Sequence, residues 1–125
     1  MESDNRPGRL LVIDDEAVAA QNLTYALTKS GHEVTTRTSG PGGIELLQRE
    51  PFDVILTDLR MERVDGMAIL KRAREVDPNI AVIMITGHAT LESAVEAMKS
   101  GAFHYIAKPF RLDEVREVVR NALEV

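Results

Sequence analysis

The chain has 125 residues, 44% of them hydrophobic and 28% charged, which suits a single soluble domain with a hydrophobic core. Its net charge of −5 argues against direct binding of nucleic acid or a membrane surface, and the absence of cysteine excludes disulfides and thiolate metal sites. Residues 1–8 are polar, so they predict a flexible leader and not a signal peptide, and no apolar run is long enough to cross a membrane. This composition is compatible with a cytoplasmic protein.

The first half of the chain alternates between strand-like and helix-like segments. The pattern predicts a buried strand, a helix, an edge strand, a helix and a second buried strand, at residues 9–13, 16–30, 33–37, 41–49 and 53–57. Gly31 is the expected stop of the first helix, because glycine readily adopts the left-handed conformation in which helices end. The edge strand is predicted from its brief, β-branched character.

The second half continues the alternation. A helix at 66–76 is followed by the most apolar run, 80–85, which we expect to be a central strand. The next helix is capped by Thr90 and ended by Gly101, and it carries four apolar residues spaced for one face: Leu91, Ala94, Val95 and Met98. A strand at 103–107 precedes a closing helix, whose predicted inward stripe is Leu112, Val115, Val118, Val119, Ala122 and Leu123.

Roughly five βα units in a row predict a doubly wound α/β fold, a five-stranded parallel sheet with helices on both faces. Polar residues stand at the ends of its strands: Asp14 and Asp15 after the first, then Asp58, Thr86 and Lys108 after later ones. Because the carboxyl ends of parallel strands share one edge, these side chains should meet in a single crevice.

The crevice has the groups that phosphoryl transfer needs. Carboxylate oxygens are hard ligands that suit Mg²⁺, so Asp14, Asp15 and Asp58 form a candidate metal set. Asp58 can act as a carboxylate nucleophile, while Lys108 and Thr86 offer an ammonium and a hydroxyl to phosphoryl oxygens. The sequence therefore predicts a magnesium-dependent phosphoryl acceptor.

Six short stretches carry a resemblance to a known family: Val12-Ile13-Asp14-Asp15-Glu16, Leu56-Thr57-Asp58-Leu59-Arg60-Met61, Asp65-Gly66, Ile85-Thr86-Gly87, Gly101-Ala102 and Lys108-Pro109-Phe110. In this order and spacing they resemble the receiver domain of two-component response regulators, over residues 9–124. The resemblance implies a flavodoxin-like strand order, 2-1-3-4-5, and a receiver domain at 9–125 after the leader.

The resemblance also implies roles for individual residues. Asp58 matches the phosphoacceptor that a sensor histidine kinase loads. Asp15 matches the main acidic ligand of Mg²⁺ and Asp14 its partner, and the backbone carbonyl of Arg60 matches the third protein ligand. The domain would then be a signalling module, an enzyme only toward its own phosphorylation and dephosphorylation.

The same resemblance implies a switch. Thr86 matches the switch hydroxyl, Lys108 the family's lysine, and Tyr105 the aromatic residue whose rotamer follows Thr86. Lys108-Pro109 matches the family's cis peptide. Arg60 and His88 flank the site in sequence, and we hypothesise that they tune the lifetime of the phosphorylated state.

Three further stretches, 86–90, 94–99 and 108–110, resemble receivers of the nitrogen-regulatory type. Such receivers precede a sigma-54-type ATPase and a DNA-binding domain, so we expect output domains beyond residue 125 and a role in transcription. The charged face of the closing helix predicts solvation, with a homodimer contact as the alternative. Glu62 departs from the family, which commonly has proline there, so it and Arg63 bear on tuning and partner choice.

Two other functions fit part of the pattern. A magnesium-dependent phosphohydrolase of the haloacid dehalogenase type also has an aspartyl nucleophile, but it needs a second Asp two residues later, where this chain has Arg60. A phosphorylation-independent interaction domain would not need the complete set of site residues.

Overall fold

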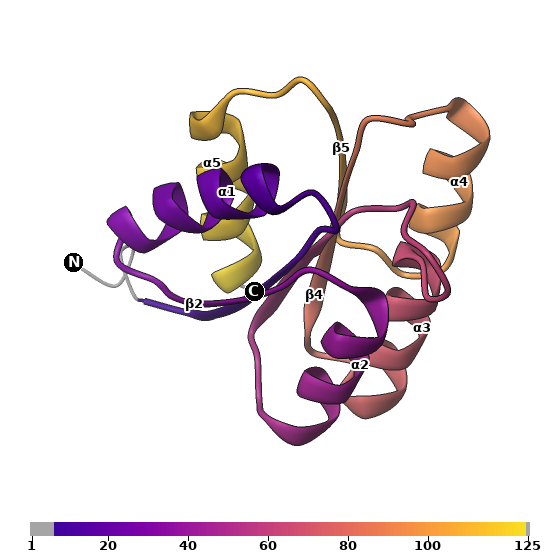
Figure 1. Ribbon diagram of the computed structural model, residues 1–125, viewed down its shortest axis with the longest axis horizontal. Coiled ribbons are helices and arrows are strands. Elements are labelled where there is room, and N and C mark those ends of the chain that lie inside the picture. The colour runs from indigo at the N-terminus through magenta and orange to yellow at the C-terminus, as the bar shows by residue number, and fades with distance from the viewer. Residues whose placement is uncertain (1–6, 125) are drawn as a thin grey trace.

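The computed structural model describes residues 7–124, in which strands and helices alternate (Figure 1). The strands are β1 (Arg9–Ile13), β2 (Glu33–Arg37), β3 (Val54–Thr57), β4 (Ala81–Thr86) and β5 (His104–Ala107). The helices are α1 (Ala17–Lys29), α2 (Gly40–Arg49), α3 (Gly66–Val76), α4 (Leu91–Lys99) and α5 (Leu112–Leu123). The predicted leader, residues 1–8, falls mostly outside the described residues. Within 7–124, no helix combines the length and apolarity needed to cross a membrane.

The strands form one parallel sheet in the order β2-β1-β3-β4-β5, which confirms the predicted fold and strand order. β2 is an edge strand, as its composition indicated. The apolar strand β4, which we predicted to be central, is interior, between β3 and β5, and β3 has the middle position of the sheet. In Figure 1, α1 and α5 lie on one side of the sheet, and α2 and α3 lie on the other.

The core has two layers because successive strand residues point to opposite faces of the sheet. Leu10 and Val12 of β1 pack toward α1 and α5, whereas Leu11 and Ile13 pack toward α2 and α3. Both faces of the central strands are therefore covered, which explains why those strands are apolar throughout.

Helix α4 departs from this pattern. Its predicted apolar face is mostly exposed: Leu91 is 82% accessible, and Val95 and Met98 are also exposed. The one buried side chain of α4 is Ala97. The spacing correctly indicated a helix, but the face that it marks is not covered by the rest of the described chain.

The closing helix matches its predicted stripe except at its start. Val115, Val118, Val119 and Ala122 are buried, but Leu112 is 40% exposed, which corrects the prediction that it points inward. Leu112 is the first residue of α5, and the first buried residue of the stripe is Val115, one turn further along.

Helix ends follow the local chemistry of the sequence. Gly31 and Gly101 both have positive φ, +99° and +105°, as the predicted helix stops require. Thr90 caps α4 by accepting a hydrogen bond from the backbone N–H of Ser93. The loop after β3 turns sharply, with Arg63 at φ 68°, and returns so closely that any side chain at Gly66 would collide with the carbonyl oxygen of Asp58.

Candidate functional site

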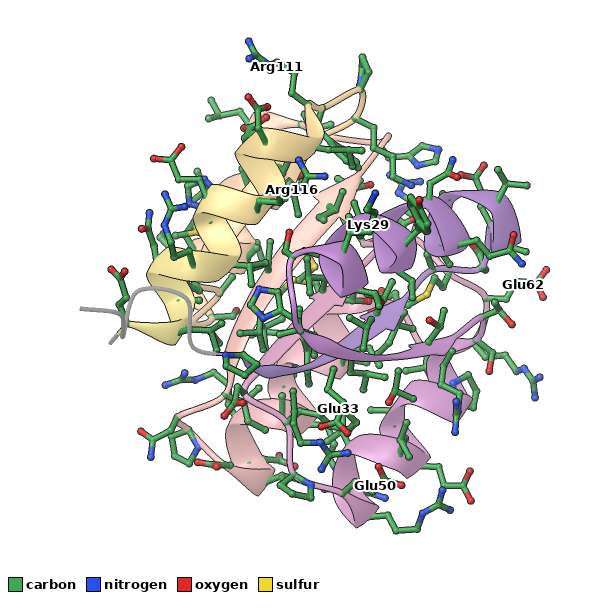
Figure 2. All side chains as sticks on the ribbon, turned by 90° about the vertical axis from the view of Figure 1, so that its left-hand side faces the viewer. Lys29, Glu33, Glu50, Glu62, Arg111 and Arg116 are labelled. Atoms are coloured by element: carbon green, nitrogen blue, oxygen red, sulfur yellow. The ribbon has the colours of Figure 1, made fainter. Side chains whose placement is uncertain are left out.

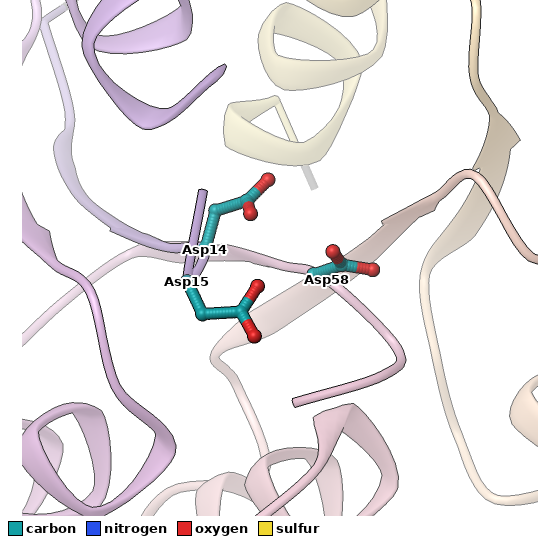
Figure 3. Close-up of side chains that lie close together, drawn as sticks. All are labelled: Asp14, Asp15 and Asp58. Atoms are coloured by element: carbon teal, nitrogen blue, oxygen red, sulfur yellow. The ribbon is translucent and has the colours of Figure 1, made fainter. Parts of the chain in front are cut away.

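The predicted polar residues meet at the carboxyl edge of the sheet. Asp14 and Asp15 directly follow β1, Asp58 follows β3, Thr86 is the last residue of β4, and Lys108 follows β5. These positions converge because β1, β3, β4 and β5 are adjacent and parallel. The close-up in Figure 3 shows the three side chains near one another, with the carboxylates of Asp14 and Asp15 extending toward Asp58.

The three carboxylates form a compact cluster. Asp14, Asp15 and Asp58 each offer a carboxylate oxygen, and these oxygens lie within 4.8 Å of one another. Asp14 and Asp58 are buried, whereas Asp15 is exposed and open to solvent. Two unit charges at ~4 Å repel by about 4 kcal/mol at an effective dielectric of about 20, so the cluster favours a cation. Hard oxygen donors, with one open side, fit Mg²⁺.

Lys108 supplies one positive charge to this cluster. Its Nζ donates to Asp14 Oδ2 at 3.0 Å and lies 3.8 Å from Asp58 Oδ2. Burial tends to lower the pKa of this amine, but the hydrogen bond to Asp14 and the charges of Asp14, Asp58 and Glu16 outweigh it, so the pKa is raised. Lys108 is therefore held as an ammonium ion beside Asp58. The Lys108-Pro109 peptide is cis, as the resemblance implied.

Backbone donors orient two of the carboxylates. The N–H of Glu16 donates to Asp14 Oδ1 at 2.9 Å, and the N–H of Arg60 approaches Asp58 Oδ1 at 3.4 Å. Glu16 holds the N-cap position of α1 without a side-chain hydrogen bond. Asp14 thus forms a local turn just ahead of α1 and turns its other oxygen toward Lys108.

A hollow of about 340 Å³ opens over the carboxylates. It is lined by Asp15, Glu16, Asp58, Arg60, Gly87, His88 and Lys108. Its size suits a small ionic group and leaves access for water. Arg60 and His88 are both exposed on its rim, where side chains can control what reaches Asp58.

The charged side chains along α5 do not converge in this way. Another hollow, about 600 Å³, runs along α5 and is lined by Arg111, Asp113, Glu114, Arg116, Glu117 and Arg120. Figure 2 shows Arg111 projecting from the start of this helix and Glu62 projecting outward on the opposite side of the molecule. Mixed charges on an open helix face are typical of a solvated surface.

Thr86 and Tyr105 lie on the neighbouring strands β4 and β5. Thr86 is fully buried, and its Oγ1 accepts a hydrogen bond from the N–H of His88 at 3.0 Å. Tyr105 is half-buried, and its hydroxyl lies 2.6 Å from Ser93 Oγ on α4. The tyrosine side chain thus reaches α4.

Two residues at the site were not predicted. Glu16 lies 3.7 Å from Lys108 and lines the hollow, and its place directly after Asp14-Asp15 was the available signal. Ser93 stands three residues after the cap Thr90, a spacing typical of capping boxes, but nothing in the sequence linked it to Tyr105.

The chain matches known proteins along nearly its whole length. The family model for the response regulator receiver domain matches residues 10–120. Among curated proteins, the transcriptional regulatory protein GlrR of Escherichia coli strain K12 is 35% identical over 96% of this chain. The DNA-binding transcriptional regulator NtrC of Klebsiella pneumoniae is 38% identical over 90% of it. The chain spans only 27% and 24% of these two relatives, about a quarter of their length.

Solved structures give the same result. A receiver domain protein from Clostridium thermocellum is 37% identical with a TM-score of 0.88, covering 93% of this chain and 94% of that one. The beryllofluoride-activated receiver domain dimer of NtrC4 is 31% identical with a TM-score of 0.87, covering 93% and 96%. The chain therefore belongs to the response regulator receiver domain family.

Proposed function

We propose that the domain stores a signal as a phosphoryl group on Asp58. The observation that carries this proposal is the burial of Asp58 among two further carboxylates and the ammonium of Lys108. A buried carboxylate in an ion pair is usually a structural liability, because desolvation offsets the attraction. This arrangement is better explained as a site prepared for incoming charge.

In the proposed reaction, a carboxylate oxygen of Asp58 attacks the phosphorus of a phosphohistidine on a sensor kinase. A P–O bond forms, the P–N bond breaks, and its electron pair returns to the imidazole nitrogen, which takes up a proton. Lys108 neutralises a phosphoryl oxygen during this transfer, which mostly requires positioning and charge compensation.

Asp14, Asp15, Asp58 and the backbone carbonyl of Arg60 would hold Mg²⁺ in this proposal. When bound, that ion would neutralise the carboxylates and the incoming phosphoryl group. Support comes from the donor set itself, whose three carboxylate oxygens are close enough to share one cation.

The switch would use Thr86 and Tyr105. The phosphoryl group would draw the Thr86 hydroxyl toward itself, and Thr86 would give up the hydrogen bond that it now accepts from the N–H of His88. Tyr105 would then turn into the space that Thr86 leaves. Hydrogen bonds to charged groups contribute about 1.5–3 kcal/mol each, so Thr86 and Lys108 together could supply most of the about 5.5 kcal/mol that a decisive shift needs.

The output is proposed to be transcriptional. The relatives are named as transcriptional regulators and are about four times as long as this chain, since it covers 27% of GlrR. We infer that a sigma-54-type ATPase and a DNA-binding domain follow residue 125 and that the protein works in the cytoplasm. A second copy of the chain is a further candidate partner.

The central test is intact mass after incubation with Mg²⁺ and a small acyl phosphate. We expect one phosphoryl group per chain, lost in Asp58→Ala and kept in Asp113→Ala, which removes an exposed carboxylate that does not line the hollow. Absence of any adduct would favour a phosphorylation-independent interaction domain. Sustained turnover of added phosphoesters would instead favour a phosphohydrolase.

The rim residues should set the lifetime of the phosphorylated state. Replacing Arg60 and His88 together by alanine should admit water more freely and shorten the lifetime by up to about tenfold, a barrier change of about 1.4 kcal/mol. Timed mass spectra after donor removal would measure it. The matched control replaces Arg111 and His104, also exposed but outside the hollow. An unchanged lifetime in the first variant would remove both residues from the mechanism.

A further inference from the structure

The hydroxyl of Tyr105 is held by a residue of the first turn of α4. Its oxygen lies 2.6 Å from Ser93 Oγ, a short distance for two hydroxyl groups. This is the hydroxyl's one hydrogen bond within residues 7–124. The contact joins β5 to α4 through the half-buried side chain of Tyr105.

Ser93 Oγ also belongs to the capping box of α4. It lies 3.1 Å from the carbonyl oxygen of Thr90, to which it can donate, and it accepts from the N–H of Thr90 at 3.2 Å. A serine hydroxyl has one donor and two acceptor positions, so Ser93 can meet Tyr105 with either kind of position, and either hydroxyl can be the donor of this contact.

A replacement for Tyr105 is already adjacent. Thr90 Oγ1 lies 3.0 Å from Ser93 Oγ and can hydrogen-bond to it in place of Tyr105 when the tyrosine leaves. Ser93 would then remain satisfied within the capping box of α4. The tyrosine can thus be released without stranding a polar group, which makes the contact reversible at low cost.

We propose that Ser93 is a positioning residue that holds Tyr105 outward in the unphosphorylated domain and so sets the resting balance of the switch. This inference rests on the proposed function and goes beyond it, since it assigns the resting state to a named partner on α4. Loss of one such hydrogen bond should raise the inward population of Tyr105 by about 2- to 10-fold.

The chain is well suited to a direct measurement, because it contains only two tyrosines. Incorporation of 3-fluorotyrosine should give two ¹⁹F resonances, and Tyr25→Phe would assign the one from Tyr105. Beryllofluoride with Mg²⁺ defines the resonance position of the activated site. Ser93→Ala should move the resting Tyr105 signal toward that position, and Ser93→Thr, which keeps the hydroxyl, should return it.

Thr90→Ala is the matched control. It removes the cap of α4 but leaves the Ser93 hydroxyl in place to hydrogen-bond with Tyr105. The proposal requires the Tyr105 resonance to move clearly more in Ser93→Ala than in Thr90→Ala. Equal movement in both would mean that the tyrosine merely senses fraying of α4, and the positioning role would be wrong.

Intact mass separates this inference from the proposed function. A phosphoryl adduct in the wild-type chain and in Ser93→Ala, together with an unmoved Tyr105 signal, would overturn the positioning role alone. Absence of the adduct in every variant would overturn the proposed function and this inference with it. An adduct in both chains with a shifted resting signal, rescued by Ser93→Thr, is the expected result.

Discussion

Helices α4 and α5 come before and after β5 in the chain, but they differ in how much of their apolar surface is buried. Four side chains of α5 are buried, Val115, Val118, Val119 and Ala122, whereas Ala97 alone is buried on α4. Burial of apolar surface is the main stabilising term in folding, so α5 with α1 forms a fixed scaffold and α4 is the more easily displaced element.

The loosely held helix is also the one that contacts Tyr105. The proposed signal from Asp58 would need a neighbouring element that can move for a few kcal/mol, and a helix anchored by one alanine meets that condition. We therefore expect the difference between α4 and α5 to be functional, and three experiments test it.

The largest effect should come from a matched pair of leucine truncations. Leu27 of α1 is fully buried in the scaffold, so Leu27→Ala should lower the free energy of unfolding by about 2–5 kcal/mol. Leu91→Ala, on the exposed face of α4, should change it by less than about 0.5 kcal/mol. Urea denaturation measures both, and similar losses would mean that α4 is as firmly packed as the scaffold.

An intermediate effect should come from enlarging the anchor of α4. Ala97→Val adds two methyl groups at a fully buried position, and overpacking of this kind costs about 1–3 kcal/mol. We expect the cost to appear as faster amide hydrogen exchange in α4, while exchange in α5 stays as in the wild type. Ala17→Val, at an exposed position on α1, controls for the lower helix propensity of valine. Uniform acceleration in both helices would contradict the separate stability of α4.

The smallest effect should be a pH dependence of the scaffold side. Burial lowers the pKa of His32, whose Nδ1 accepts a hydrogen bond from the N–H of Gly8 at 3.1 Å. The folded domain therefore prefers neutral His32, and this contribution is present above the ordinary value of about 6.5 and is lost as the pH falls through the lowered pKa. Urea unfolding between about pH 7.5 and 5.5 should show the loss.

The control for this pH dependence is another histidine. His32→Gln should flatten the dependence, because glutamine does not titrate, whereas His88→Gln, at an exposed position, should retain it. If His32→Gln left the slope of stability against pH unchanged, another group would have to account for it.

The sheet and the site could largely be predicted from sequence, because both depend on position along strands. Runs such as Ile80–Ile85 are apolar on both faces, which marks buried parallel strands, and a polar residue at each carboxyl end marks the site. The positions of Asp14, Asp15 and Asp58 at strand ends were enough to predict that their side chains lie close together, as they do.

What could not be predicted depends on packing between elements. The spacing of Leu91, Val95 and Met98 reveals an apolar helix face but carries no information on whether anything covers it. Leu112 continues the stripe of α5 in sequence, yet it precedes the point where the helix meets the sheet. The bond from Tyr105 to Ser93 joins two polar side chains twelve residues apart, and only coordinates reveal it.

The ion pair between Lys108 and Asp14 limits how far from the site the proposed phosphorylation would change the electrostatic potential. Three carboxylates and one ammonium leave two negative charges, the amount that a divalent cation balances. A phosphoryl group carries about −1.5 to −2 and replaces the single charge of Asp58, so the net charge of the domain changes by only about one unit or less. Beyond a Debye length of about 8 Å, salt would hide so small a change. If Asp58 is phosphorylated as proposed, a distant partner would have to recognise an altered surface shape, and not an altered charge.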